Sequence, residues 1–336
     1  MKLSTNPWIL TSTAFLLSIV VNFLMIRKSR KNGWFLDPHD AHKPQRFHKT
    51  PTPRAGGIGI MAGLLPLFAF PWGWRLFFPA LAALFSGLFE DFRRDLSPRK
   101  RLFLQLFAAL VALWLSGTVV DYLGFGIHLP YVIALAFSAF AIVGAMNAFN
   151  IIDGFNGLAG GTALMILLAF TFTAHEVQLH KLEMVLWMII ASLAGFLLFN
   201  FPRGLIFLGD GGAYLLGFLV AITGITLAGS REDVSPWYIL AAMIYPVWEV
   251  LFSILRKRAE GRSPLQPDPY HLHMLVYRHI TKSNPGTSIL LLAANLPFLL
   301  LATVYHHNSK ANFGIVLLYI LSYTLFYHLL RREESR

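Results

Sequence analysis

Cysteine is absent from the 336 residues of this chain. Its absence excludes disulfide bonds, thiolate nucleophiles and cysteine-ligated metal sites. Charged residues are also scarce, at 13% of positions, whereas hydrophobic residues make up 56% and the mean hydropathy is +0.57. Soluble domains carry about 25% charged residues. The composition therefore predicts an integral membrane protein.

Long soluble segments are missing as well. The sequence has no repeat of solenoid period and no low-complexity tract, so we expect one integral membrane domain over residues 1–336. A basic, aromatic-rich soluble domain is absent too, and we expect no nucleic-acid partner. The first apolar run precedes its basic cluster instead of following it, which predicts a retained first helix and no cleaved signal peptide.

Apolar runs long enough to cross the roughly 30 Å hydrocarbon core of a bilayer recur along the chain. They lie at 8–26, 56–72, 75–89, 102–119, 131–149, 158–174, 184–200, 212–228, 237–255, 287–304 and 312–330. The predicted fold class is an all-α integral membrane protein with about eleven transmembrane helices.

Lysine and arginine are divided unevenly between the two sides of these helices. Of the 28 basic residues, 23 lie on the side of the C-terminus and five on the side of the N-terminus. The positive-inside rule then predicts a periplasmic N-terminus and a cytoplasmic C-terminus. The net charge of +11 is mainly this topology signal, with attraction to anionic lipids or phosphorylated substrates as a second explanation.

The unusual polar segments all fall on the side predicted to be cytoplasmic. We expect five loops to form one site: 27–54, 90–101, 150–157, 201–211 and 256–286. The first of them supplies His48, Lys49 and Arg54 beside prolines that stiffen the entry to the second helix. These three basic side chains are candidates to bind an anionic substrate.

The stretch NAFNIIDGFNGLAGG, residues 147–161, is the densest polar segment. Asn147, Asn150, Asp153 and Asn156 recur every third residue, a spacing that lets their side chains share one helix face. The glycines allow close approach of a ligand to the backbone. A carboxylate between membrane helices is costly, which favours a binding site. The alternative is a glycine-rich helix contact with polar side chains bonding across it.

Three aspartates are the best candidates for metal ligands. They are Asp91, Asp153 and Asp210. Because Mg²⁺ binds a few carboxylates and completes its shell with water and substrate phosphates, their convergence predicts a magnesium site. Histidine and arginine from the segment PDPYHLHMLVYRH, residues 267–279, would neutralise phosphate charge.

Two of these clusters also have simpler explanations. Glu90 and Asp91 would fit a solvated helix end paired with the following arginines. His271 and His273 are spaced for zinc, but no third and fourth zinc ligands are evident.

Taken in order, the five clusters resemble the motifs of the polyprenyl-phosphate N-acetylhexosamine-1-phosphate transferases, the superfamily of WecA and MraY in glycosyltransferase family 4. The resemblance runs from about residue 40 to 282, and the segment PDPYHLH looks like the WecA-type branch. It implies transfer of N-acetylhexosamine-1-phosphate from a UDP-sugar to undecaprenyl phosphate in the bacterial inner membrane. It also implies release of UMP at the cytoplasmic face, Mg²⁺ with Mn²⁺ as an alternative, and a role in starting O-antigen or exopolysaccharide synthesis.

The resemblance assigns roles by position. The catalytic candidates are Glu90, Asp91, Asp153, His271 and His273, and the metal ligands are Asp91, Asp153 and Asp210. The substrate-binding candidates are His48, Lys49, Arg54, Asn150, Asn156, Asn200, Phe207 and Arg278. Among them, Phe207 matches the aromatic position that stacks on uracil, and Asn200 a polar position of the nucleoside pocket. We expect Asp91→Asn and Asp210→Asn each to abolish turnover without disturbing the fold.

The sequence departs from the family pattern at three of these positions. Glu90 replaces an aspartate, Asn156 replaces the second aspartate of the DGxDG motif, and Met274 replaces a histidine. Asn156 cannot ionise, so we expect it to hydrogen-bond uridine and not to act as a base.

Several alternatives stay open from the sequence alone. The peptidoglycan branch of the same superfamily, a phospho-MurNAc-pentapeptide transferase, is disfavoured by the HLHM segment. A transporter would need acids near mid-span, where Glu249 is the one candidate, although it also fits a helix-packing hydrogen bond. An inactive scaffold would leave the acidic set without a role. The sequence also allows a homodimer.

Overall fold

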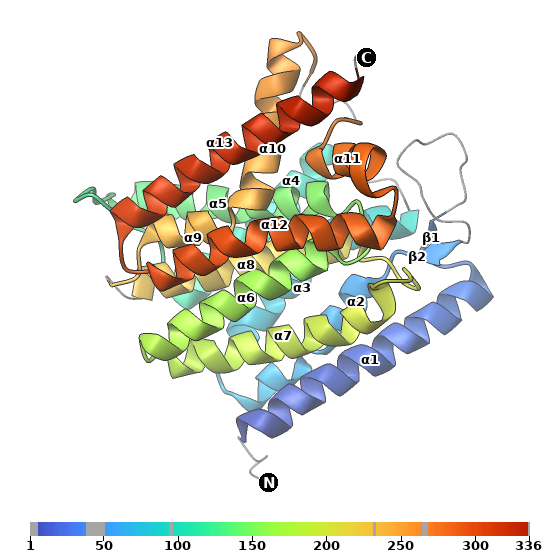
Figure 1. Cartoon of the computed structure of the whole chain (residues 1–336). Helices are drawn as coiled ribbons and strands as arrows, with labels where there is room; N and C mark the ends of the chain where they lie inside the picture. The colour runs from blue at the N-terminus through green and yellow to red at the C-terminus, as the bar shows by residue number, and fades with distance from the viewer. Residues whose placement is uncertain (1–5, 38–50, 94–96, 231–232, 264–267, 335–336) are drawn as a thin grey trace.

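The computed structural model describes residues 6–37, 51–93, 97–230, 233–263 and 268–334. Most of this chain is helical (Figure 1). The α-helices are α1 (Pro7–Asn32), α2 (Gly56–Ala62), α3 (Trp74–Arg93), α4 (Pro98–Ser116), α5 (Tyr131–Ile152), α6 (Leu158–Glu176), α7 (His180–Asn200), α8 (Gly209–Ser230), α9 (Pro236–Ala242), α10 (Ile244–Ala259), α11 (Leu272–Val276), α12 (Asn284–Val304) and α13 (Ser309–Glu334). Two short non-α helices, η1 (Leu65–Ala69) and η2 (Tyr277–Thr281), and two paired strands, β1 (Leu36–Asp37) and β2 (Thr52–Pro53), complete it.

The chain is a multi-pass membrane protein. Among the described residues, α1, α5, α6, α7, α8, α12 and α13 are long and apolar enough to cross a bilayer, and α9 with α10 adds an eighth span if that pair, bent by 76°, crosses once. Helices also occupy the other predicted runs. However, α2 and η1 are short pieces, α3 carries charged residues at both ends, and α4 carries them at its start. The all-α membrane fold is confirmed, whereas the predicted count of eleven spans is not.

Local sequence signals set several helix ends. The Asn6 side chain accepts a hydrogen bond from Trp8 N and caps α1, which begins at a proline. The same device, a capping serine followed by a proline in the first turn, begins α9 at Ser235 and α12 at Ser283. Gly33, in the left-handed conformation at φ 74°, ends α1.

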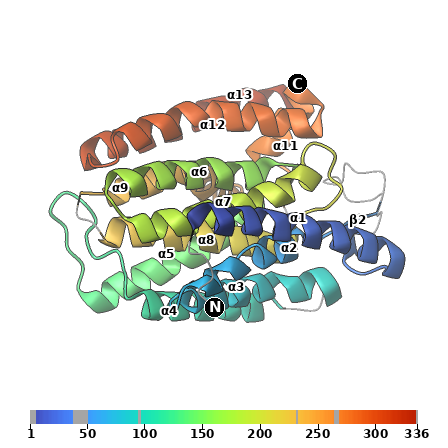
Figure 2. The same cartoon turned by 90° about the horizontal axis from the view of Figure 1, so that it is seen from below.

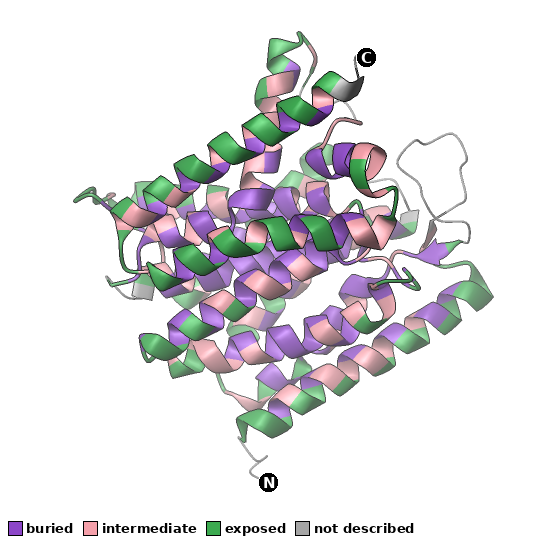
Figure 3. Ribbon diagram, viewed as in Figure 1, coloured by how far each residue is buried: buried purple, intermediate pink, exposed green. Residues whose placement is uncertain are grey.

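Helix α8 lies at the centre of the bundle, in contact with α2, α3, α4, α5, α6, α7 and α9 (Figure 2). Of its spanning window, 89% is buried by protein, compared with 28% for α1 and 33% for α12 and α13. Exposed residues follow the outer faces of α1, α12 and α13, where they would meet lipid (Figure 3).

The helix ends that carry the polar motifs meet at one end of this bundle. There α3, α5 and α7 end, and α4, α6, α8 and α12 begin. The strand pair β1–β2 and the short helix α11 lie at the same end, at the right of Figure 1. The fold therefore brings together segments that are far apart in the sequence.

Candidate functional site

Asp210 lies in the first turn of the central helix α8 and collects polar side chains from three other segments. Its Oδ1 accepts hydrogen bonds from Arg54 Nη2 at 2.6 Å and Asn150 Nδ2 at 3.2 Å. Its Oδ2 lies 3.4 Å from Arg101 Nη1. The side chain keeps 17% of its exposure, so the carboxylate can be reached. Two arginines beside a helix N-terminus make this region strongly attractive to an anion.

Backbone pairing holds Arg54 in this position. Phe207 N donates to Pro53 O at 2.8 Å, and Gly56 N donates to Phe207 O at 2.9 Å, so the backbone on either side of Arg54 pairs with the segment that leads into α8. Arg54 N also donates to Phe35 O at 2.8 Å. Arg54 and Phe207 are thus neighbours in a short parallel bridge, which places the predicted uracil-stacking residue beside the acidic cluster.

Asp91 anchors the start of α8 from the end of α3. Its carboxylate accepts hydrogen bonds from Asp210 N at 3.0 Å and Gly211 N at 2.9 Å, and Arg54 Nε lies 3.1 Å from its Oδ1. The two helices touch at Gly87, where a Cβ atom would lie 2.4 Å from the carbonyl carbon of Asp210. Asp91 is buried and satisfies two of the free N–H groups of the helix terminus. These contacts give it a structural role that the sequence did not indicate.

Asp153 follows the last turn of α5, next to Asn150. Burial, together with the negative charges of Asp210 and Asp91, raises the pKa of Asp153 well above 3.8 against the opposing effect of Arg54. No described residue forms a hydrogen bond or ion pair with its carboxylate. A half-buried carboxylate with no partner among the described residues is available to a cation or a hydrogen-bonding ligand.

The loop after Asp153 is fixed by asparagines. Gly157 N donates to Asn200 Oδ1 at 2.7 Å, and Asn200 Nδ2 donates to Ile206 O at 2.9 Å. Asn156 Nδ2 donates to Pro202 O at 3.1 Å, and Asn156 N donates to Asn284 Oδ1 at 2.8 Å. The oxygen and the nitrogen of the Asn200 amide are therefore both bonded to backbone groups, and they join two loops. The Asn156 amide nitrogen is already bonded to a backbone carbonyl.

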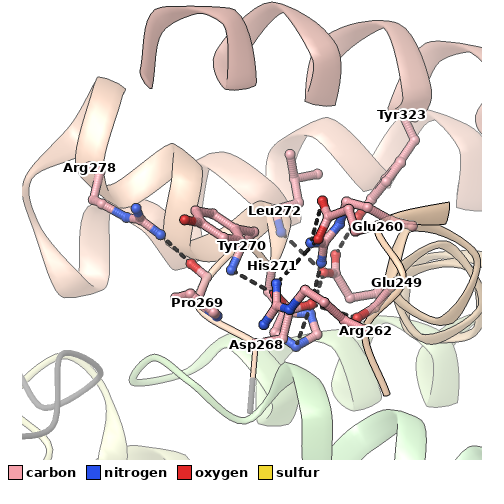
Figure 4. Close-up of polar contacts among 12 residues, drawn as sticks. Glu249, Glu260, Arg262, Asp268, Pro269, Tyr270, His271, Leu272, Arg278 and Tyr323 are labelled. Carbon is pink, nitrogen blue, oxygen red and sulfur yellow. Dashed lines mark hydrogen bonds and ion pairs between the residues drawn. The ribbon is translucent and has the colours of Figure 1, made fainter. Parts of the chain in front are cut away.

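The stretch from Asp268 to His273, called the histidine segment below, is held by Glu249 of α10. His271 Nδ1 donates to Glu249 Oε1 at 2.9 Å, Leu272 N donates to the same oxygen at 3.1 Å, and Tyr323 OH donates to Oε2 at 2.7 Å (Figure 4). Glu249 is 1% exposed. Three donors compensate for the burial of this carboxylate.

Asp268 is the second acidic anchor of the histidine segment. It accepts hydrogen bonds from Ser253 Oγ at 2.6 Å and Tyr270 N at 3.0 Å, and it forms an ion pair with Arg256. Burial favours a higher pKa for Asp268, but the Ser253 hydrogen bond, His271, the Tyr270 N–H and Arg256 together lower its pKa to about 2. A lowered pKa stabilises the folded state above the ordinary value of 3.8, so this anchor is intact at neutral pH.

His273 connects the histidine segment to the loop after Asp153. Its ring stacks on His271 with centroids 5.4 Å apart and packs edge-on against Phe155. A Cβ atom on Gly154 would lie 2.9 Å from His273 Nε2. Burial lowers the pKa of His273 to about 4, so the ring is neutral at neutral pH, and its buried Nδ1 has no hydrogen-bond partner among the described residues.

The remaining predicted residues lie in different surroundings. Arg278 donates to Pro269 O and lies 5.7 Å from the Tyr270 ring, so it braces the loop that contains it. Glu90 is half-buried near the end of α3, one residue before Asp91. His48 and Lys49 lie outside the described residues.

Four further residues join the site without having been named as candidates, although all but Glu249 lie in loops predicted to form it. They are Arg101, Glu249, Asp268 and Asn284. Arg101 is the last residue of the predicted site loop 90–101, in a basic run that also contributes to the topology count. From the sequence, Glu249 fits a packing or transport residue. Its histidine partner is 22 residues further along the chain, so no local pattern connects the two.

The acidic residues of the site differ in how well their carboxylates could bind Mg²⁺. Within the described chain, no three His, Asp or Glu side chains are grouped closely enough to hold a metal ion. Mg²⁺ needs only one or two carboxylates when substrate phosphates and water supply the other ligands. Among the described residues, the Asp153 carboxylate has no partner and the Asp210 oxygens contact two arginines and an amide, so both aspartates fit that requirement. Asp91 fits it less well because backbone N–H groups already occupy both of its oxygens.

Comparison with known proteins gives one consistent result. The model of glycosyl transferase family 4 matches residues 74–228. An undecaprenyl-phosphate alpha-N-acetylglucosaminyl 1-phosphate transferase of Salmonella typhi is 26% identical, over 96% of this chain and 92% of its own length. A protein of the same name from Thermotoga maritima is 29% identical, over 87% of both chains. A decaprenyl-phosphate N-acetylglucosaminephosphotransferase of Mycolicibacterium smegmatis is 30% identical, over 67% of this chain and 65% of its own.

The family-model match contains Asp91, Asn150, Asp153 and Asp210, which the fold gathers around Arg54 and the N-terminus of α8. The ordered motifs of the sequence, the gathered site and the full-length relatives agree. The chain belongs to glycosyl transferase family 4, in the superfamily of polyprenyl-phosphate N-acetylhexosamine-1-phosphate transferases.

Proposed function

We propose that this protein transfers N-acetylhexosamine-1-phosphate from a UDP-sugar to undecaprenyl phosphate, giving undecaprenyl-diphospho-sugar and UMP. The observation that carries the proposal is the arrangement around α8. There Asp210 contacts Arg54, Arg101 and Asn150, and the half-buried Asp153 has no side-chain partner among the described residues. The names of the relatives support a polyprenyl phosphate acceptor, undecaprenyl in two of them and decaprenyl in the third, and an N-acetylglucosamine phosphate as the transferred group.

The residues suit displacement at phosphorus. An oxygen of the lipid phosphate attacks the β-phosphorus of the UDP-sugar, a new P–O bond forms, and the bond to the bridging oxygen breaks to release UMP. Arg54, Arg101 and the N-terminus of α8 would balance the phosphate charge. A phosphate monoester is mostly ionised at pH 7, so the attacking oxygen needs no strong base.

Magnesium belongs to this proposal as a cofactor, held by Asp153 and Asp210. When bound, the ion would neutralise charge on the diphosphate, which is the main electrostatic requirement of phosphoryl transfer. Manganese, which prefers similar oxygen ligands, would serve in its place.

We place the site at the cytoplasmic face of the bacterial inner membrane, with the N-terminus in the periplasm. The distribution of basic residues supports this orientation, since 23 of 28 lie on the side that carries the site. A transporter is disfavoured because Glu249, its one candidate, is bonded to His271 of the histidine segment. The product would start O-antigen or exopolysaccharide synthesis.

The function is tested with purified protein, undecaprenyl phosphate, Mg²⁺ and a panel of UDP-sugars, scored by UMP release. The panel contains UDP-GlcNAc, other UDP-N-acetylhexosamines and UDP-MurNAc-pentapeptide. We expect UMP release with at least one UDP-N-acetylhexosamine and none with the pentapeptide donor. Turnover with the pentapeptide donor alone would assign the protein to the peptidoglycan branch, and no turnover with any donor would refute the proposal.

The position of Phe207 beside Arg54 leads to a separate prediction. If its ring stacks on uracil, Phe207→Ala removes a contact made equally in the bound substrate and the transition state, which raises KM and leaves kcat nearly unchanged. Steady-state kinetics should therefore show a higher KM for the UDP-sugar and an unchanged KM for the lipid phosphate. The opposite pattern would place the lipid at Phe207.

A further inference from the structure

We infer that Tyr323, on the last helix α13, is a positioning residue for the transfer reaction, because its hydroxyl fixes the Glu249 carboxylate that in turn fixes the His271 ring. The inference rests on the proposed function. It concerns a part of the chain beyond residues 74–228, the segment that the family model matches.

The Glu249 carboxylate has no freedom to rotate while its three donors are in place. Oε2 accepts from Tyr323 OH at 2.7 Å, and Oε1 accepts from His271 Nδ1 at 2.9 Å and Leu272 N at 3.1 Å. Without the Tyr323 hydroxyl, one oxygen of a buried carboxylate loses its donor, and the group gains by turning away from His271 toward another partner.

The orientation of His271 matters because its ring contacts His273, and His273 in turn contacts Gly154, the residue next to Asp153. His271 stacks on His273 with an angle of 5° between the ring planes. His273 Nε2 lies against Gly154, the residue after Asp153. The bond to Glu249 also places a proton of His271 on Nδ1, as carboxylates do for histidines in many active sites, while Nε2 lies 3.8 Å from Asp268 Oδ2.

Tyr323 lies on the face of α13 that contacts the histidine segment and the residues around it. Residues four apart on a helix share a face. One turn after Tyr323, the Tyr327 ring lies 5.7 Å from the Arg256 guanidinium, and one turn later the Arg331 guanidinium lies 3.5 Å from the centre of the Tyr270 ring. Figure 4 shows Tyr323 reaching Glu249 beside the segment that carries Tyr270 and His271.

The test compares Tyr323→Phe with the control variant Tyr245→Phe, which also removes one buried tyrosine hydroxyl. Tyr245 lies on α10 one turn before Glu249, and its buried hydroxyl has no hydrogen-bond partner in the described chain. We expect kcat of Tyr323→Phe to fall on the order of ten- to a hundredfold, the scale of loss when a substitution away from the chemistry misplaces a group of the site. KM for the UDP-sugar should stay at the wild-type value, the thermal midpoint should fall because the buried Glu249 carboxylate loses a donor, and Tyr245→Phe should match wild type in all three measurements.

A double-mutant cycle with Glu249→Gln separates positioning from packing. If Tyr323 acts through Glu249, adding Tyr323→Phe to Glu249→Gln causes no further loss of kcat, whereas losses that multiply overturn the inference. Mass-spectrometric mapping of diethyl pyrocarbonate modification adds a measurement that needs no turnover, since a released His271 ring should react faster in Tyr323→Phe than in wild type or Tyr245→Phe.

Two failures are distinguishable. Wild-type kcat and wild-type His271 modification in Tyr323→Phe would overturn the positioning role and leave the proposed function standing. A wild-type protein that releases no UMP with any donor would refute the proposed function and, with it, this inference.

Discussion

Asp210→Asn should reduce UMP release by at least about a hundredfold, the usual cost of removing a group that manages charge in a transition state. Asn keeps the shape of the side chain but not the charge that would hold Mg²⁺ and set the positions of Arg54 and Arg101. The fold should persist, because the amide oxygen still accepts from Asn150 and the side chain is not fully buried. Initial rates of UMP release at saturating Mg²⁺ measure the effect.

Asp121→Asn is the matched control for Asp210→Asn. Asp121 is exposed and lies between α4 and α5, at the end of the bundle away from the site. This substitution should leave both rate and thermal midpoint unchanged. Wild-type turnover in purified Asp210→Asn would contradict the assignment of Asp210 as a metal ligand.

Asp91→Asn should lose stability as well as activity. The carboxylate accepts from Asp210 N and Gly211 N, and an amide at this position turns an NH₂ group toward one of those donors. A buried N–H left without an acceptor costs roughly 2 kcal/mol, so thermal unfolding in detergent should show a clearly lower midpoint than for wild type or Asp210→Asn. This result differs from the expectation drawn from the sequence, which treated the two aspartates alike.

The two aspartate variants together separate anchoring from direct ligation. If Asp91→Asn were inactive with a wild-type thermal midpoint, Asp91 would act on the substrate or metal directly, and its hydrogen bonds to α8 would be incidental. A lowered midpoint with partial activity would agree with the anchoring role.

Much of the site could be predicted from the sequence because its residues occur in compact motifs at helix ends. Asp210 beside glycines, and Asn150 with Asp153 three residues later, are costly in a membrane segment and thus stand out. Positive-inside counting placed these motifs on one side, and the fold brings Arg54, Asn150 and Asp210 into contact.

The remaining features depend on contacts between helices, which no local pattern encodes. The anchoring role of Asp91 needs the close approach of α3 and α8 at Gly87. The role of Glu249 needs a loop to fold back over α10, and its bond to Tyr323 spans 74 residues. Likewise, hydropathy does not distinguish a full span from the short pair α2 and η1, or from the bent pair α9 and α10.

The most direct test of sugar-1-phosphate transfer follows the two phosphorus atoms of the donor. Purified protein is given undecaprenyl phosphate, Mg²⁺ and an accepted UDP-N-acetylhexosamine labelled with ³²P at either the α- or the β-position, and the lipid and aqueous phases are separated. We predict that β-label moves to the lipid and that α-label stays in the aqueous phase as UMP. Aqueous β-label recovered as UDP, with the sugar alone on the lipid, would contradict the account.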